Sequence, residues 1–226
     1  MVILCFGARD DSKSCYSFDG HINYICKSNS WHMRGKLASY KNSLLVVGGF
    51  GTTQETGSDS LDSSGETELM ERKKDGSFIW SVIESSIYSK VEQHSLVTVP
   101  PCDTNEEYVL LIGGYNNNNS NYFYNYSEKS WSRDILSTVF KFNGTWSYFG
   151  MLNKPRYFHN SIYWNGAVYI IGGEHGDSDE EEKTKIEIWK IQDSQNLFQT
   201  SENWPELYDW NLPHLFIVPD SFFPDY

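Results

Sequence analysis

Residues 156–173 read RYFHNSIYWNGAVYIIGG, a strand-like run that turns at Asn165-Gly166 into an apolar segment ending in two glycines. Asn-Gly supplies the positive φ angles of a tight hairpin turn, so the stretch predicts two antiparallel strands. The same ending recurs as LLVVGGF at Leu44–Phe50 and VLLIGGY at Val109–Tyr115. Three copies indicate an internal repeat. Its marker residues are Gly48, Gly49, Gly113, Gly114, Gly172 and Gly173.

A second hairpin signal follows each glycine pair after a long polar segment. Each signal is a period-two run, a turn containing Asp or Asn, and then an aromatic residue. The three instances are Glu68–Glu71 with Trp80, Val139–Phe142 with Trp146, and Ile186–Trp189 with Phe198. The repeat therefore predicts four strands per unit and an all-β fold with almost no helix. A two-sheet sandwich with coincidental glycines is the alternative.

The order of an arginine, a histidine near a serine, a Gly-Gly strand and a later tryptophan resembles the kelch repeat of the galactose oxidase/kelch superfamily. Arg156–Gly173 is the best copy, and the repeats are degenerate, since Phe198 stands where tryptophan is usual. The resemblance implies a kelch-type β-propeller with three nearly complete four-stranded blades plus a partial blade. That makes about four blades in total, or a fragment of a larger propeller.

On this interpretation residues 1–226 form a single domain. Residues 1–36 are a partial blade, and the last segment supplies a closing or fourth-blade strand that includes His214–Val218. Closure of the ring would remove exposed strand edges. The blades between them span residues 37–91, 92–154 and 155–207, followed by the closing segment 208–226.

The charge of the chain narrows the classes of partner. Its formal net charge is −12, and phosphate backbones and anionic membrane surfaces both require clusters of Lys or Arg. We therefore expect neither nucleic acid nor membrane as a partner. The N-terminus lacks the basic start and long apolar region of a signal peptide, which leaves the compartment open between secreted and cytoplasmic.

Catalytic and cofactor motifs are not found in the sequence. There is no nucleophile elbow and no phosphate-binding glycine loop, and His94 and His159, at matching repeat positions, are predicted to be structural. Galactose oxidase binds copper through tyrosines and histidines, but no comparable set of ligands is present. The acidic run Asp177–Glu182 is predicted to be a solvated loop, with Ca²⁺ binding as the alternative. We expect a protein without a cofactor that is not an enzyme.

Two of the four cysteines, Cys5 and Cys15, flank the turn-rich segment Ala8–Lys13. A hairpin there would place them opposite each other, within the range of a disulfide below ~7 Å between Cα atoms. They are predicted to form either a bridge or two buried thiols.

Long segments follow all three glycine pairs, at Gly51–Gly65, Asn116–Arg133 and Glu174–Thr184. Equivalent strands would direct them to one face. The middle segment carries Tyr122, Tyr124, Tyr126 and Trp131 among asparagines and serines, a composition typical of binding loops, although an outer strand would also explain it. The hypothesis is a non-catalytic scaffold that binds an unknown protein partner. The alternatives are a structural component of a secreted assembly and a galactose-oxidase-like enzyme.

Overall fold

The described part of the chain folds entirely into β-structure. The computed structural model describes residues 2–6, 13–53, 60–63, 65–84, 90–101, 106–116, 124–125, 130–131, 134–174, 185–192 and 196–203. Within these ranges there is no helix, and every strand pairing between named strands is antiparallel. The prediction of an all-β fold is confirmed.

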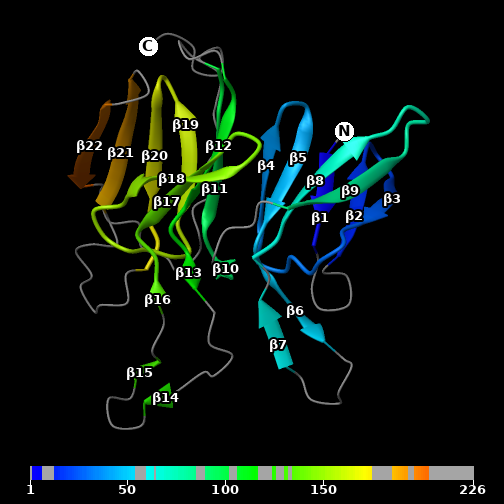
Figure 1. The fold of residues 1–226 in the computed structure, drawn as a ribbon, viewed down its shortest axis with the longest axis horizontal. Helices are drawn as coiled ribbons and strands as arrows, with labels where there is room; N and C mark the ends of the chain where they lie inside the picture. Colours follow the sequence, from blue (N-terminus) through cyan, green and yellow to red (C-terminus); the bar gives the residue numbers. More distant parts are fainter. Residues whose placement is uncertain are drawn as a thin grey trace.

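Three sheets have four strands each and share one topology, with the strands hydrogen-bonded in chain order (Figure 1). Sheet 2 contains β4 (Lys36–Tyr40), β5 (Ser43–Val47), β8 (Thr67–Arg72) and β9 (Phe78–Ile83). Sheet 3 contains β11 (Ser95–Val99), β12 (Tyr108–Ile112), β17 (Thr138–Phe142) and β18 (Trp146–Met151). Sheet 4 contains β19 (Asn160–Trp164), β20 (Ala167–Ile171), β21 (Lys185–Gln192) and β22 (Asn196–Asn203).

Sheet 1 precedes these three and has only three strands. They are β1 (Val2–Cys5), β2 (Ser14–Phe18) and β3 (Ile22–Lys27), with β2 in the centre. The strands of sheets 1 to 4 fall within the predicted units 1–36, 37–91, 92–154 and 155–207, except that β4 begins one residue early. The predicted closing segment 208–226 lies outside the described residues.

Shorter strands lie outside these sheets, and all of those described except β10 fall in segments that follow the second strand of a sheet. Four of them form two separate hairpins, β6 (Phe50–Thr53) with β7 (Ser60–Ser63) and β14 (Tyr124–Asn125) with β15 (Ser130–Trp131). The other three form one small sheet of β10 (Val91–Glu92), β13 (Tyr115–Asn116) and β16 (Asp134–Ile135).

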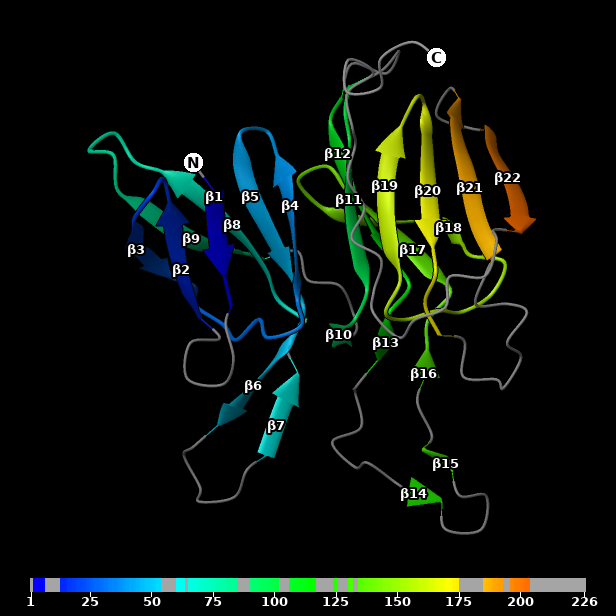
Figure 2. The same ribbon diagram turned by 180° about the vertical axis from the view of Figure 1, so that it is seen from behind.

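Consecutive sheets lie side by side (Figure 2), and three apolar clusters join them, each with residues from two consecutive sheets. The first strands of sheets 2 and 3 lie in contact, as do those of sheets 3 and 4. The four sheets therefore pack in chain order. Representative cluster members are Cys15, Val46 and Trp80 between sheets 1 and 2, Leu45, Val109 and Phe142 between sheets 2 and 3, and Leu110, Val168 and Trp189 between sheets 3 and 4.

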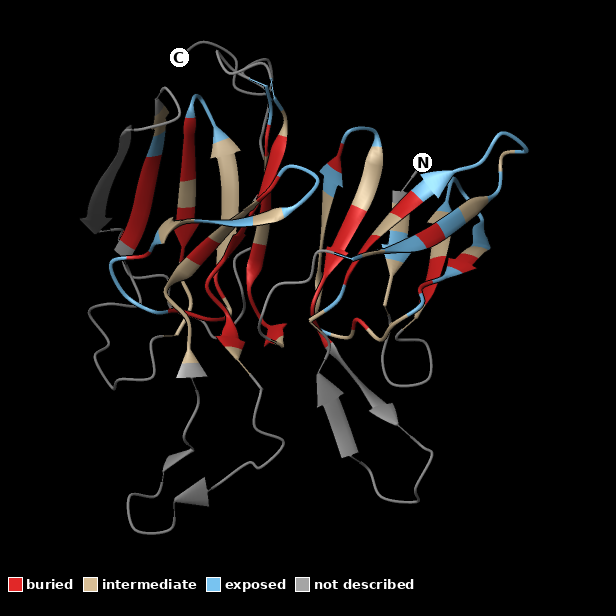
Figure 3. Cartoon of the chain, viewed as in Figure 1, coloured by how far each residue is buried: buried red, intermediate tan, exposed pale blue. Residues whose placement is uncertain are grey.

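The second strand of each four-stranded sheet is the most deeply buried, as the red segments of β5, β12 and β20 show in Figure 3. In sheets 2 and 3 its two faces pack on two different neighbouring sheets, so both faces are apolar. In sheet 4 one face packs on sheet 3, and the other forms an apolar cluster with Ile186 and Ile188 of β21. This explains why LLVV, VLLI and VYII are continuous apolar runs and do not alternate with polar residues. These runs end at the glycine pairs.

Two strand starts differ from the sequence-based expectation. The run 156–163 is predicted to be a strand, and the run QHSLVTV at 93–99, at the matching position of the preceding repeat, is too. However, β11 begins at Ser95 and β19 at Asn160. Gln93 and Phe158 have φ angles of 55° and 57°, and Arg34 before β4 has 61°. A positive φ lies outside the β region, so the chain turns at this point before each first strand begins.

The outward face of sheet 1 is apolar and exposed. Leu4, Tyr16 and Tyr24 face one another across the three strands, and Phe18 pairs with Ile22 beside them. Ile22 is 71% exposed and Tyr24 57%. The opposite face of this sheet carries the cysteines and packs on sheet 2.

Candidate functional site

The glycine pairs close the second strand of each four-stranded sheet, immediately before the segments predicted to bind a partner. All six glycines have positive φ angles, from 53° at Gly113 to 95° at Gly49 and Gly173. L-residues with a side chain rarely adopt this conformation. The predicted marker glycines thus occupy equivalent positions in sheets 2, 3 and 4.

In sheets 2 and 3 the first glycine of the pair contacts the segment that enters the next sheet. A Cβ atom on Gly48 would lie 2.1 Å from the Val91 carbonyl oxygen, and one on Gly113 would lie 2.6 Å from the Arg156 carbonyl oxygen. A Cβ on Gly172 meets nothing within 4 Å among the described residues. The neighbouring amide of Gly49 donates to the same Val91 oxygen at 2.9 Å. The first glycine therefore permits close approach between sheets.

The second glycine contacts the segment that enters its own sheet. A Cβ on Gly49 would lie 2.8 Å from the Cα of His32, and one on Gly114 would lie 2.7 Å from the Cβ of His94. At Gly173 the nearest atom would be the Tyr157 carbonyl oxygen, at 2.7 Å. The two positions in a pair are thus glycine for two different steric reasons.

A buried carboxylate lies on the third strand of sheet 2. Both oxygens of Glu68 accept hydrogen bonds, from the amide and side chain of Asn29 at 2.8 Å each and from the amide of Ser30 at 2.7 Å. His32 lies between this carboxylate and the Gly48 carbonyl, with Nε2 3.0 Å from Glu68 Oε1 and Nδ1 2.6 Å from the carbonyl oxygen. Each ring nitrogen faces an oxygen acceptor, so two protons are needed for these two hydrogen bonds. Either both ring nitrogens carry one, or Nδ1 carries one and the Glu68 carboxyl carries the other.

Sheet 4 repeats this arrangement with different residues. Arg156 donates to the Gly172 carbonyl at 3.0 Å and lies 3.8 Å from Glu187, which also accepts from the amide of Asn153 and from Trp189 Nε1. Arg156 and Glu187 are both almost fully buried. Sheets 2 and 4 thus each hold a nitrogen-bearing side chain, His32 or Arg156, between a glycine carbonyl and a buried glutamate.

Sheet 3 has apolar residues at these two positions. Val91, like Arg156, lies three residues before the histidine that precedes the first strand, and Phe140 pairs with Leu111 as Glu187 pairs with Ile170. These two equivalent positions therefore hold a polar pair in sheets 2 and 4 and an apolar pair in sheet 3. Neither pair is predicted from the sequence, where the one available signal is a glutamate among the strand residues 67–70 and 186–189.

Burial and hydrogen bonding act in opposite directions on Glu68. Burial alone would raise the pKa of its carboxyl, but the hydrogen bonds from His32, Asn29 and Ser30 together lower that pKa below its ordinary value. The carboxyl is therefore ionised, and it faces His32 as Glu187 faces Arg156.

His94 and His159 are buried beside the first glycines of the preceding sheets. Burial lowers the pKa of His94 to about 3, and the nearby charges of Lys36 and His32 act in the same direction. Burial likewise lowers the pKa of His159 well below its ordinary value, as does Arg156. Neither nitrogen of His94 has a hydrogen-bond partner in the described part of the chain. Both histidines are thus neutral packing residues in the folded state.

We expect the stability of the protein to fall as the pH drops below about 6.5, and His94→Leu to flatten this dependence. Below pH 6.5 the unfolded chain binds a proton at His94, whereas the folded protein leaves this buried histidine neutral. The free energy of unfolding is therefore unaffected by His94 above its ordinary pKa, and it falls by up to about 1.4 kcal/mol per pH unit between pH 6.5 and pH 3. Urea unfolding at pH 7 and pH 5 measures the difference. His21→Gln, at an exposed position, should keep the wild-type dependence. An unchanged slope in His94→Leu would contradict the assignment.

Two of the segments after the glycine pairs project to the same side of the molecule, where Figures 1 and 2 show β6–β7 and β14–β15 beyond the ends of the sheets. The base of the middle segment is closed by pairing of Tyr115 with Ile135 and of Asn116 with Asp134. Both segments therefore leave the sheets from the edge that carries the glycine pairs.

The predicted binding residues are only partly described. Tyr124 pairs with Trp131 across β14 and β15, which agrees with the alternative that this segment contains an extra strand. Tyr122 and Tyr126 lie outside the described residues, as do Asp177–Glu182 and most of the third segment.

Cys5 and Cys15 are opposite each other on β1 and β2 and form a disulfide, with their Cα atoms 4.1 Å apart. This is one of the two outcomes predicted for the pair. The sequence analysis did not identify the third cysteine of the same sheet, Cys26, which is a buried free thiol.

Over the described residues, no three His, Cys, Asp or Glu side chains form a group that could hold a metal ion. A search of the same residues finds no helix that could cross a membrane.

No family model and no curated protein matches the chain. Its fold matches 148 chains of solved structures, among them one described as "Structure of YjhT", with a TM-score of 0.58 and 16% sequence identity. The match covers 84% of this chain and 52% of that chain. At this identity the likeness concerns the fold alone, and this chain spans about half the length of the matched protein.

Proposed function

We propose that the chain is a kelch-type β-propeller scaffold that binds a protein partner through the segments following its Gly-Gly strands. The observation that carries this proposal is the projection of β6–β7 and β14–β15 from the same side of the molecule. Insertions that leave equivalent strands on one side can contact one partner together. The scaffold is proposed to be non-catalytic.

The packing of the sheets supports the propeller part of the proposal. In a propeller, four-stranded sheets are arranged radially, and their first strands meet near the axis. Here the first strands of sheets 2, 3 and 4 contact one another in sequence, and the first glycines of sheets 2 and 3 lie against the segments that enter the next sheet. Sheet 1 would be the partial blade.

The composition of the middle segment supports the binding part. Tyr and Trp offer large contact areas at a low cost in side-chain entropy, and Asn and Ser add adaptable hydrogen bonds. Residues 115–131 combine all four types. β13 and β16 pair with each other where this segment leaves and rejoins sheet 3. The two ends of the segment are therefore fixed before binding, which lowers the conformational entropy lost on binding.

We expect the triple variant Tyr124→Ala, Tyr126→Ala, Trp131→Ala to reduce capture of a partner by about tenfold or more, while the melting temperature changes by less than about 4 °C. Immobilised wild-type and variant proteins are compared by quantitative mass spectrometry of what each retains from the same extract. Trp164→Ala is the matched control, because Trp164 is an aromatic residue 56% exposed at the β19–β20 turn, the end of sheet 4 away from its glycine pair.

Loss of the same captured proteins in the triple variant, but not in Trp164→Ala, supports the binding face. Unfolding of the triple variant would instead identify these aromatic residues as part of a core. Equal capture by all three proteins would exclude the middle segment as the contact.

A second candidate function is a structural role in a secreted assembly, which the Cys5–Cys15 disulfide favours. Disulfides persist in oxidising compartments and are rare in the cytosol. The galactose-oxidase-like alternative has no comparable observation in its favour. A peptide map of the protein taken from its own source, alkylated before lysis, distinguishes a bridged from a reduced pair.

A further inference from the structure

Three cysteines form one row across sheet 1. Cys5 of β1 is directly opposite Cys15 of β2, and Cys15 is directly opposite Cys26 of β3. Because β2 is the central strand, Cys15 has a cysteine on each side. All three belong to the face that packs on sheet 2.

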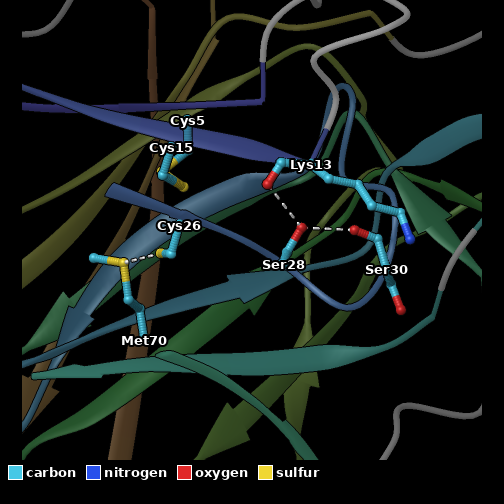
Figure 4. Close-up of a disulfide and its surroundings, with 7 residues drawn as sticks. All are labelled: Cys5, Lys13, Cys15, Cys26, Ser28, Ser30 and Met70. Atoms are coloured by element: carbon cyan, nitrogen blue, oxygen red, sulfur yellow. Dashed lines mark hydrogen bonds between the residues drawn. A yellow bond between two sulfur atoms is a disulfide. The ribbon is translucent and has the colours of Figure 1, made fainter. Parts of the chain in front are cut away.

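Only one of the two possible bridges is present. Cys5 and Cys15 are joined, and Cys26 is a buried free thiol whose Sγ donates to Met70 Sδ at 3.6 Å (Figure 4). Directly opposite residues in an antiparallel pair have Cβ atoms about 4.5–5.5 Å apart, close to the range from which a disulfide forms. Cys26 is therefore, like Cys5, a directly opposite neighbour of Cys15, although a bulge follows Cys15 on the β3 side.

We propose that sheet 1 is a thiol–disulfide exchange site in which the bridge moves between Cys5–Cys15 and Cys15–Cys26. The Cys26 thiolate attacks Cys15 Sγ, a Cys15–Cys26 bond forms, and the Cys5–Cys15 bond breaks. Cys5 leaves as a thiolate and takes up the proton that Cys26 lost. One disulfide and one thiol are present before and after, so the step needs no oxidant or reductant.

The surroundings of Cys26 control the rate of this exchange. Burial raises the pKa of the Cys26 thiol, and a hydrogen bond with Trp80 only partly offsets this effect. The attacking species is the thiolate, so exchange is slow while sheet 1 stays packed on sheet 2. It accelerates when the edge of the sheet opens, which couples the position of the bridge to the packing of this sheet.

The two bridges differ in which outer strand they hold. In the Cys5–Cys15 form the edge strand β1 is tied covalently to β2. In the Cys15–Cys26 form β3 is tied, and β1 is held only by its backbone pairing. Since Leu4 of β1 is part of the exposed apolar face with Tyr16 and Tyr24, movement of the bridge changes the stability of that face.

A tryptic peptide map separates the two forms. Cleavage after Arg9, Lys13 and Lys27 gives one peptide with Cys5 and one with both Cys15 and Cys26. The Cys5–Cys15 form yields two linked peptides with an alkylated Cys26. The Cys15–Cys26 form yields separate peptides, one with an internal bridge and one with an alkylated Cys5. Folded protein carrying Cys102→Ser is held in a glutathione redox buffer, quenched with acid, alkylated and digested.

We expect both bridged forms from this protein. Cys5→Ser can form only the Cys15–Cys26 bridge, so we expect neither Cys15 nor Cys26 to be alkylated in that variant. The matched control is Cys15→Ser, in which Cys5 and Cys26 are separated by a strand, roughly 10 Å, and stay reduced. Cys26→Ser retains Cys5–Cys15 and serves as the folding reference by circular dichroism.

The proposal is overturned if Cys5→Ser is folded but its Cys15 and Cys26 remain reduced, and are alkylated, in the redox buffer in which Cys26→Ser forms the Cys5–Cys15 bridge. It is equally overturned if the protein with all three cysteines never yields alkylated Cys5. Neither result depends on the binding role proposed above.

Discussion

Gly48→Ala is expected to destabilise the protein by roughly 3–5 kcal/mol, because the new methyl group would lie against the backbone of the next sheet. The Cβ position is 2.1 Å from the Val91 carbonyl oxygen and 3.0 Å from Val91 Cγ1. That carbonyl also accepts the amide of Gly49, so it cannot move without loss of a hydrogen bond. Equilibrium unfolding in guanidinium chloride measures the change.

Gly172→Ala is the matched control, since the two glycines end equivalent strands with φ angles of 63° and 70°. The cost of a left-handed alanine, about 1–2 kcal/mol, applies to both. Only Gly48 adds the collision with the next sheet, because a Cβ on Gly172 meets nothing within 4 Å in the described residues. If the two variants lose the same amount of unfolding free energy, glycine is required at these positions by the backbone conformation alone and not by the contact with the neighbouring sheet.

The repeat was predictable because its signals are local. Asn165-Gly166 and Asp75-Gly76 specify turns by their own conformational preferences, and the apolar runs before the glycine pairs follow from burial on both faces. The four-stranded order of sheets 2 to 4 could therefore be inferred from spacing. The opposition of Cys5 and Cys15 followed in the same way from the turn-rich segment between them.

The buried pairs could not be inferred because they depend on contacts between distant residues. His32 meets Glu68 only when the segment leaving sheet 1 crosses the third strand of sheet 2. Cys26 was missed for the same reason, since its register opposite Cys15 includes a bulge that no spacing rule places. The turns at Gln93 and Phe158 were also missed, because neither residue favours a positive φ.

Arg156→Met is expected to cost about 3–5 kcal/mol, because it leaves the Glu187 carboxylate buried without its cation. Glu187 is 1% exposed, and two of its other donors, the Asn153 amide and Trp189 Nε1, are neutral. The Gly172 carbonyl loses the Arg156 donor as well. Lys190→Met removes a cation from an exposed position of the same strand and should change stability by less than about 0.5 kcal/mol.

The double variant Arg156→Met, Glu187→Leu should be more stable than Arg156→Met alone, although it removes two polar groups. Sheet 3 carries Val91 and Phe140 at these positions, so the repeat tolerates an apolar pair there. Replacing both partners removes the stranded charge, whereas replacing one creates it. A double variant that is less stable than the single one would mean that Glu187 acts mainly through Asn153 and Trp189, holding the segment that enters sheet 4, and that the charge of Arg156 is secondary.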